Sequence, residues 1–151
     1  MFRGRHEHAV DAKGRTSLPA RFREVLAAQG ETRIVVTVSL DGCLAAYPMR
    51  EWEAFEEKLI SLPSLDEEMT ELKRQLVGNA VECDIDKLGR LMLPTTLREL
   101  AGISRNVLWM GMISYIEVWD PATRIARDRS VVESDERRQS MRRRATELGL
   151  R

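Results

Sequence analysis

The feature that most constrains the fold is an internal repeat with a fixed offset of 75 residues. Residues 11–24 return as residues 86–99, and Asp, Gly, Arg, Leu, Pro, Arg and Glu coincide at seven of fourteen positions. A weaker similarity continues through two later apolar segments, in which residues 34–38 match 107–110 and residues 44–48 match 116–120. Self-similarity of this kind is typical of a chain built from copies of one unit. We therefore predict two pseudo-symmetric halves packed into one body.

The first half of the unit is predicted to be a β-hairpin followed by a helix. His6–Val10 has the pattern of a short strand, Asp11–Gly14 is a turn in which the glycine takes a positive φ, and Arg15–Leu18 returns as the partner strand. Pro19 suits the first turn of a helix that ends before Gly30. Its apolar stripe is Phe22, Val25 and Leu26.

Two further strands complete the unit. They are expected near residues 33–38 and 43–47, on either side of an Asp41-Gly42 turn. Each copy is therefore predicted to run strand, strand, helix, strand, strand. The fold class is α+β, with added packing helices.

The segment between the copies is predicted to form two amphipathic helices. In Pro48–Leu62 one face carries Trp52, Phe55, Leu59 and Ile60. Ser64–Glu67 has the pattern of a capping box that opens a second helix, whose stripe is Met69, Leu72, Leu76 and Val77. The expected organisation is a first unit, 1–48, the connecting helices, 49–79, a second unit, 80–123, and a charged tail, 124–151. A helix continues into this tail, and from about residue 130 its many charges favour fraying or disorder.

Composition predicts a globular protein without a membrane segment. The chain of 151 residues is 43% hydrophobic, which is enough for a real core. No stretch approaches the roughly 20 apolar residues that span a bilayer, and the start lacks a signal-peptide pattern, so we expect a cytoplasmic location. Cys43 and Cys83 lack the spacing of a zinc ribbon and are expected to be small buried residues.

The net charge is zero, but the charges are unevenly distributed. Residues 1–23 contain six basic and two acidic side chains, and residues 124–151 contain nine arginines and five acids. The intervening body is therefore acidic. A basic N-terminal unit on an acidic body is suited to presenting one face to phosphates.

The repeated Asp-x-x-Gly-Arg turn, followed by a strand that ends in Leu-Pro and by a short helix, resembles the MraZ family. The similarity covers residues 1 to about 125, including Met1-Phe2 with Gly4, the two repeated motifs, and the segment Tyr115–Trp119. This resemblance implies an AbrB-like swapped-hairpin fold with a β-barrel-like body. It also implies a nucleoid-associated transcriptional regulator that binds short direct repeats upstream of its own division and cell-wall operon. Members of the family assemble into rings, so double-stranded DNA and further copies of the chain are the expected partners.

The motif itself also suggests DNA recognition. A β-ribbon fits the major groove, and an arginine can donate two hydrogen bonds to guanine O6 and N7. Arg15 is the first candidate for this role. The basic residues expected to contact bases or phosphates are Arg3, Arg5, Lys13, Arg15, Lys87 and Arg90. An alternative interpretation is that Arg15 pairs with Asp11 and only closes the turn, and the same applies to Arg90.

The two copies differ in ways that favour the first as the DNA reader. Lys13, Thr16, Ser17 and Arg21 are replaced by Leu88, Leu91, Met92 and Thr96, which are poorer partners for phosphate. Near the second turn, Glu82, Asp84 and Asp86 would repel a DNA backbone. The second hairpin is therefore predicted to serve mainly as the intramolecular partner of the first.

Three other classes of protein remain as alternatives. His6 and His8 share a strand face, so a metal-binding enzyme is conceivable, but no third ligand has a recognisable spacing. A structural ring protein would leave the basic N-terminal unit unexplained. An antitoxin of the same hairpin fold would carry a long toxin-binding segment in place of the second unit. No catalytic motif is present, so we expect no enzyme activity, cofactor or small-molecule substrate.

Overall fold

Both copies of the repeat form strand, strand, helix, strand, strand in that order, which confirms the predicted unit. The first copy contains β1 (Arg5–Ala9), β2 (Arg15–Ser17), α1 (Ala20–Ala28), β3 (Arg33–Val38) and β4 (Leu44–Pro48). The second contains β5 (Val81–Asp84), β6 (Arg90–Met92), α4 (Thr95–Leu100), β7 (Asn106–Met112) and β8 (Tyr115–Trp119). Between them lie α2 (Met49–Ser61) and α3 (Glu67–Leu76), and α5 (Pro121–Glu133) and α6 (Asp135–Glu147) follow.

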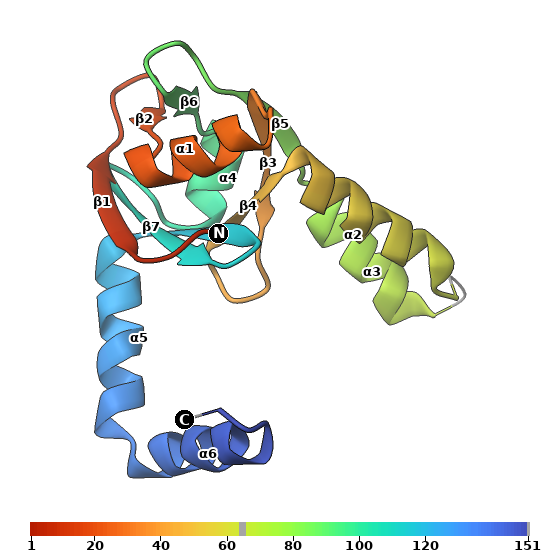
Figure 1. The fold of residues 1–151 in the computed structure, drawn as a ribbon, viewed down its shortest axis with the longest axis vertical. Helices are drawn as coiled ribbons and strands as arrows, with labels where there is room; N and C mark the ends of the chain where they lie inside the picture. Colours follow the sequence, from red (N-terminus) through yellow and green to blue (C-terminus); the bar gives the residue numbers. More distant parts are fainter. Residues whose placement is uncertain (64–65, 151) are drawn as a thin grey trace. The chain divides into compact units, whose positions relative to one another are not determined.

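The computed structural model describes residues 1–63 and 66–150. They form two units, one that begins at Met1 and ends at Asp120 and one that begins at Pro121. The first unit contains all of the described strands, which pair antiparallel, together with helices α1 to α4 (Figure 1). The α+β class is therefore confirmed, and so is the packing of both copies into one body.

The strands of the two copies are exchanged. The six-stranded sheet has the order β1-β7-β8-β4-β3-β5, so the first strand of each copy lies beside the third strand of the other. In register, Arg5 faces Met110 and Ala9 faces Asn106, while Val81 faces Val36 and Asp84 faces Arg33. A separate ribbon joins β2 to β6. The pairs β1–β7, β3–β5 and β2–β6 each join a strand of one copy to a strand of the other, so neither copy has a complete sheet alone.

The exchange corrects the predicted local hairpin between His6–Val10 and Arg15–Leu18. Only one bridge, Val10 to Thr16, joins these segments. Beyond this bridge the two segments separate, because β2 pairs with β6 of the other copy. In that pairing Thr16 lies opposite Leu91, and both residues are buried. In the described residues the six-stranded sheet ends at β1 and β5, and the predicted barrel-like closure is not seen.

The core lies between the large sheet and the helices of the two copies. Trp109 and Trp119 are almost completely buried. Equivalent positions of the two copies contribute to one core cluster, among them the pairs Leu18 and Leu93, Phe22 and Leu97, and Ile34 and Val107. The predicted helix stop at Gly30 is confirmed, since this glycine has a φ of 73°.

The connecting helices agree with the prediction in position but not in every contact. Trp52 and Leu59 are buried, whereas Ile60, predicted for the same face of α2, is 79% exposed. The step of 100° per residue explains this error, because Ile60 follows Leu59 and lies at the side of the stripe. The predicted capping box includes Ser64, which lies outside the described residues. Among the described residues, the side chain of Asp66 caps α3 by accepting a hydrogen bond from Glu68 N–H at 3.0 Å.

The C-terminal part of the chain, which begins at Pro121, is helical, contrary to the predicted fraying or disorder after about residue 130. Ser134 caps α6 through a hydrogen bond from Arg137 N–H at 3.2 Å, and Asp135 and Glu136 occupy its first turn. Negative charges at this position interact favourably with the helix dipole. In the described part of the chain, no helix combines the length and apolar character needed to cross a membrane.

The exchange predicts that both copies unfold together. Leu18→Ala is expected to lower the free energy of unfolding by about 2–5 kcal/mol, because Leu18 is fully buried in the joint core. The measurement is chemical denaturation followed by both circular dichroism and tryptophan fluorescence. Leu88→Ala is the control, since Leu88 is 67% exposed and its loss should change stability by less than about 0.5 kcal/mol. Two separate transitions for the two copies would contradict the prediction.

Candidate nucleic-acid interface

The two Asp-x-x-Gly-Arg turns are built by a carboxylate that organises the backbone. Asp11 Oδ1 accepts hydrogen bonds from Lys13 N–H at 2.9 Å and from Arg15 N–H at 2.8 Å. Gly14 N–H donates to Asp11 O at 2.9 Å, and Gly14 has a φ of 84°, a conformation that suits glycine. Backbone N–H donors therefore close the turn without any contribution from the side chain of Arg15.

The same carboxylate also orients the arginine that follows. Arg15 Nε donates to Asp11 Oδ2 at 2.8 Å, and Arg90 Nε donates to Asp86 Oδ2 at 3.0 Å in the second copy. The terminal Nη groups of both arginines have no hydrogen-bond partner in the described part of the chain. Each aspartate therefore holds one edge of the guanidinium and leaves the donor atoms at its tip available.

The electrostatics of the turns agree with this geometry. The pKa of the Asp11 carboxyl lies below its ordinary value of 3.8, mainly because the Arg15 backbone N–H binds the charged form, with the Arg15 side chain adding to the effect. The pKa of Asp86 is lowered in the same way by Arg90. Both carboxylates are consequently charged at neutral pH.

Each turn is locked against the other copy. Leu18 N–H donates to Gly89 O, and Leu93 N–H donates to Gly14 O, both at 2.9 Å. Two equivalent arginines cover these glycines. A Cβ on Gly14 would lie 2.8 Å from Arg98 Nη2, and one on Gly89 would lie 2.2 Å from Arg23 Nη1. Arg23 and Arg98 are repeat identities, so the sequence contained this signal, but its structural role was missed.

The β2–β6 ribbon brings the two turns and their arginines onto one surface. Thr16 and Leu91 point into the core, so the alternating neighbours face outward. These outward residues are Arg15 and Ser17 from β2, and Arg90 and Met92 from β6. Arg15 and Arg90 also line the same cavity of about 420 Å³. The exposed face of the ribbon therefore carries two pre-oriented arginines.

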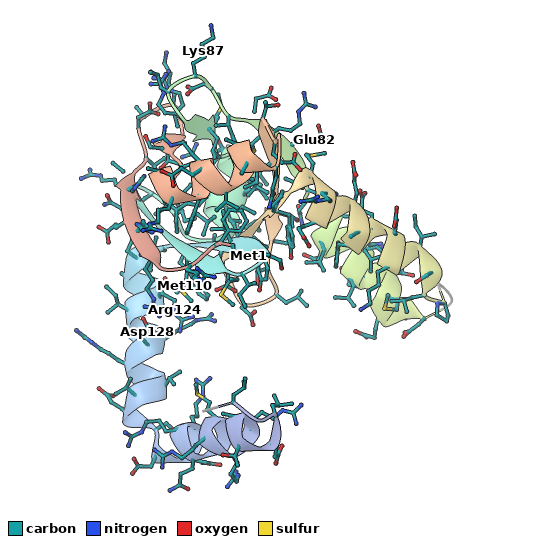
Figure 2. All side chains as sticks on the ribbon, viewed as in Figure 1. Met1, Glu82, Lys87, Met110, Arg124 and Asp128 are labelled. Carbon is teal, nitrogen blue, oxygen red and sulfur yellow. The ribbon has the colours of Figure 1, made fainter. Side chains whose placement is uncertain are left out.

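The remaining predicted site residues fall into two groups. Lys13 and Lys87 lie in the two turns beside the ribbon, and Figure 2 shows Lys87 projecting from its turn. Arg3 and Arg5 lie at the other end of β1, because Arg5 pairs with Met110 while the Asp11 turn follows Ala9. The structure thus brings Arg15 and Arg90 together on the ribbon and places Lys13 and Lys87 in the turns at its two ends, while Arg3 and Arg5 lie at the far end of β1.

The acidic residues near the second turn are paired. Arg33 contacts Glu82 at 3.1 Å and Asp84 at 3.5 Å, and Asp86 is engaged by Arg90. All of these pairs are exposed and contribute little to stability. They nevertheless reduce the negative charge that the sequence suggested would repel DNA from the second hairpin.

The other candidate groups have structural partners. His6 packs edge-on against Phe22 with ring centroids 5.3 Å apart, and the His8 ring contacts the Ser17 carbonyl at 2.5 Å. No cluster of three metal-ligating side chains occurs in the described residues. Burial raises the pKa of Cys43 to about 12 and that of Cys83 to about 11, so both are neutral thiols at physiological pH.

Comparison with known proteins identifies the family. The family described as "MraZ protein, putative antitoxin-like" matches residues 1–75 and 76–126. The chain belongs to the MraZ family. Proteins named "Transcriptional regulator MraZ" are similar to this MraZ-family chain over most of their length. The one from Thioalkalivibrio sulfidiphilus is 43% identical over 137 residues, which cover 90% of this chain and 91% of the relative. The one from Pelotomaculum thermopropionicum is 46% identical over 119 residues, 79% of each.

In this MraZ-family chain, the lowered pKa of Asp11 makes the turn sensitive to acid. A depressed folded-state pKa contributes stability that is present above the ordinary value and is lost as the pH falls through the folded-state value. The turn should therefore loosen only below about pH 4. NMR titration of the Asp11 carboxyl should give a pKa below 3.8.

The Arg15→Ala variant separates the two causes of this shift. It retains the backbone N–H, so the pKa of Asp11 should rise only part of the way toward its ordinary value. Asp11→Asn provides the control, since it keeps an acceptor oxygen but cannot titrate. An Asp11 pKa at or above 3.8 in the unmodified chain would be incompatible with the turn geometry.

Proposed function

We propose that this chain is a DNA-binding transcriptional regulator that reads sequence with the exposed face of the β2–β6 ribbon. One observation carries the proposal: two arginines, Arg15 and Arg90, are held through Nε by Asp11 and Asp86, while their Nη groups have no hydrogen-bond partner in the described residues. The names of the relatives support a regulatory role. The MraZ family assignment supports it as well.

The proposed recognition chemistry follows from the arginine fork. A guanidinium that enters the major groove can donate two parallel hydrogen bonds to O6 and N7 of guanine. Fixing Nε on a carboxylate reduces the side-chain freedom lost when those bonds form. The Asp–Arg pair therefore serves both as a turn element and as a device that aims the arginine, and the two interpretations of the motif are compatible.

The other basic residues have a positioning role in this proposal. Lys13 and Lys87, one in each turn, are placed to contact phosphates on either side of the ribbon. Arg5 is proposed as a further phosphate contact for DNA that extends along β1, whereas Arg3 precedes that strand and lies beside the β7–β8 turn. Such contacts fix register but do not read sequence. The first copy supplies more positive charge, whereas Arg90 gives the second copy a reading residue of its own.

A single ribbon has only three residues per strand, so one chain covers few base pairs. We propose that the chain acts as a ring-shaped homo-oligomer, whose ribbons bind short direct repeats spaced near one helical turn, about 10 bp. Linked binding of this kind gains roughly 10² to 10⁴ in affinity. The proposed target lies upstream of the chain's own division and cell-wall operon, in the nucleoid.

The exchange of β1 and β5 supports an AbrB-like swapped-hairpin assignment.

The test is a binding series on DNA from directly upstream of the gene, measured by fluorescence anisotropy at two salt concentrations. Arg15→Ala and Arg90→Ala should each weaken specific binding by about 1–3 kcal/mol per engaged base pair and relax the preference at that position. Lys13→Ala should weaken binding to all sequences alike and reduce the salt slope by about one.

Arg144→Ala is the matched control. Arg144 is an exposed arginine of α6 that is ion-paired with Glu147 at 3.2 Å, as Arg15 is with Asp11, but it lies outside the ribbon. Its loss should leave DNA binding unchanged. Full specific binding by the double variant Arg15→Ala/Arg90→Ala would refute the proposed readout.

A further inference from the structure

The turn between β7 and β8 contains a strained, exposed isoleucine. Ile113 has a φ of 69° and is the single non-glycine residue with positive φ in the described part of the chain. A β-branched side chain rarely adopts this conformation. Its side chain is 66% exposed, so burial in its own chain does not compensate for the strain. Strain of this kind points to a role outside the monomer.

The backbone around Ile113 is held firmly. Phe2 N–H donates to Ile113 O, and Ile113 N–H donates to Phe2 O, both at 2.9 Å. Gly111 permits this close approach, because a Cβ there would lie 2.3 Å from Arg3 N. The tip is therefore a fixed apolar projection with Arg3 beside it, and Arg3 has no ion-pair partner in the described residues.

The equivalent turn of the first copy shows that the hairpin does not need an isoleucine. Between β3 and β4, the left-handed position is taken by Gly42, with a φ of 89°. That turn carries an exposed aliphatic residue as well, Leu40, which is 67% exposed. Leu40 is outside the left-handed region and carries no strain. The two tips thus form a natural pair for comparison.

A groove of about 490 Å³ lies between α2 and α3, which run side by side (Figure 1). Its apolar lining is Leu59, Ile60 and Val77, and Ile60 is the exposed residue that α2 does not bury. A branched aliphatic side chain matches this lining in size and chemistry. The groove therefore offers the apolar environment that Ile113 lacks in its own chain.

Charge favours the same pairing. Glu56 forms the α2 side of the groove, and Glu53 and Glu57 are exposed on the same helix, all without an ion-pair partner in the described residues. On the α3 side, Lys73 also lines the groove, while the charge of Arg74 is taken up by Glu71. A tip that carries Arg3 beside an aliphatic residue is thus complementary to the α2 side.

We propose that the Ile113 tip of one chain inserts into the α2–α3 groove of a second, identical chain. The inference rests on the homo-oligomer proposed above and names its contact surfaces. The tip and the groove are different parts of the chain, so the interface is heterologous. Repetition of such a contact gives a ring when the rotation closes, and an open filament when it does not.

The test measures the mass of the full-length chain without DNA, by analytical ultracentrifugation. Ile113→Asn and Ile60→Asp should each raise the dissociation constant at least about 10-fold and yield monomers. Asparagine tolerates the left-handed conformation, and Ile60 is exposed, so both variants should fold. Leu40→Asn and Leu100→Asp, at exposed positions elsewhere, are the matched controls and should leave the assembly intact.

Mixing the two variants tests the direction of the contact. The Ile113→Asn chain has an intact groove and the Ile60→Asp chain has an intact tip, so an equimolar mixture should form a two-chain complex and nothing larger. In the monomeric Ile60→Asp background, adding Ile113→Asn should raise Tm by about 2–4 °C, because the strain is relieved.

The outcomes separate this inference from the proposed function. Assembly that persists in both variants, or a mixture that stays monomeric, would overturn the tip-and-groove contact and leave DNA reading untouched. A fall in Tm on adding Ile113→Asn would overturn the assignment of strain. A monomeric unmodified chain that still binds operator DNA specifically would overturn both the assembly and this contact, but not the readout by the ribbon.

Discussion

The structure depends on the reciprocal exchange of backbone hydrogen bonds between the two copies. Leu18 N–H binds Gly89 O, and Leu93 N–H binds Gly14 O, so each turn is fixed by the strand that follows the other turn. These bonds hold β2 against β6, and that pairing sets the distance between the two arginines. A chain with one copy would leave these donors and acceptors unpaired, and a buried backbone group without a partner is costly. The duplication therefore builds the surface as well as the core.

The sequence predicted the order of elements but not their pairing. Periodicity and turn residues are local signals, and they correctly indicated the strands, the helices and the stops such as Gly30. Whether β1 pairs with β2 or with β7 depends on contacts about 100 residues apart, which local patterns do not encode. The helical tail was missed for a related reason, because high charge suggested disorder while the Ser134 cap and the acidic first turn favour a helix.

The candidate site was located from the repeat, and the structure changed its interpretation. From sequence, the pairing of Arg15 with Asp11 and a role in DNA reading were alternatives. The geometry makes them compatible, since the carboxylate binds Nε and leaves the Nη groups unpaired in the described residues. The pairing of Glu82 and Asp84 with Arg33 likewise removes part of the predicted asymmetry between the copies. Neither point could be read from spacing, because both depend on which atom of a side chain is engaged.

Assembly and recognition are linked through the small size of the ribbon. Two strands of three residues can bury little surface and engage few phosphates, so a DNA affinity carried by one ribbon would be low and strongly dependent on salt. Under the proposed function, specificity for a promoter therefore requires several ribbons in one assembly, with a spacing set by the contacts between chains. The proposed contact also accounts for the strain at Ile113, because insertion into the groove of a neighbouring chain would offset the unfavourable conformation. In this proposal the duplication pairs two reading residues within one chain, and the contact between chains repeats that pair along the DNA.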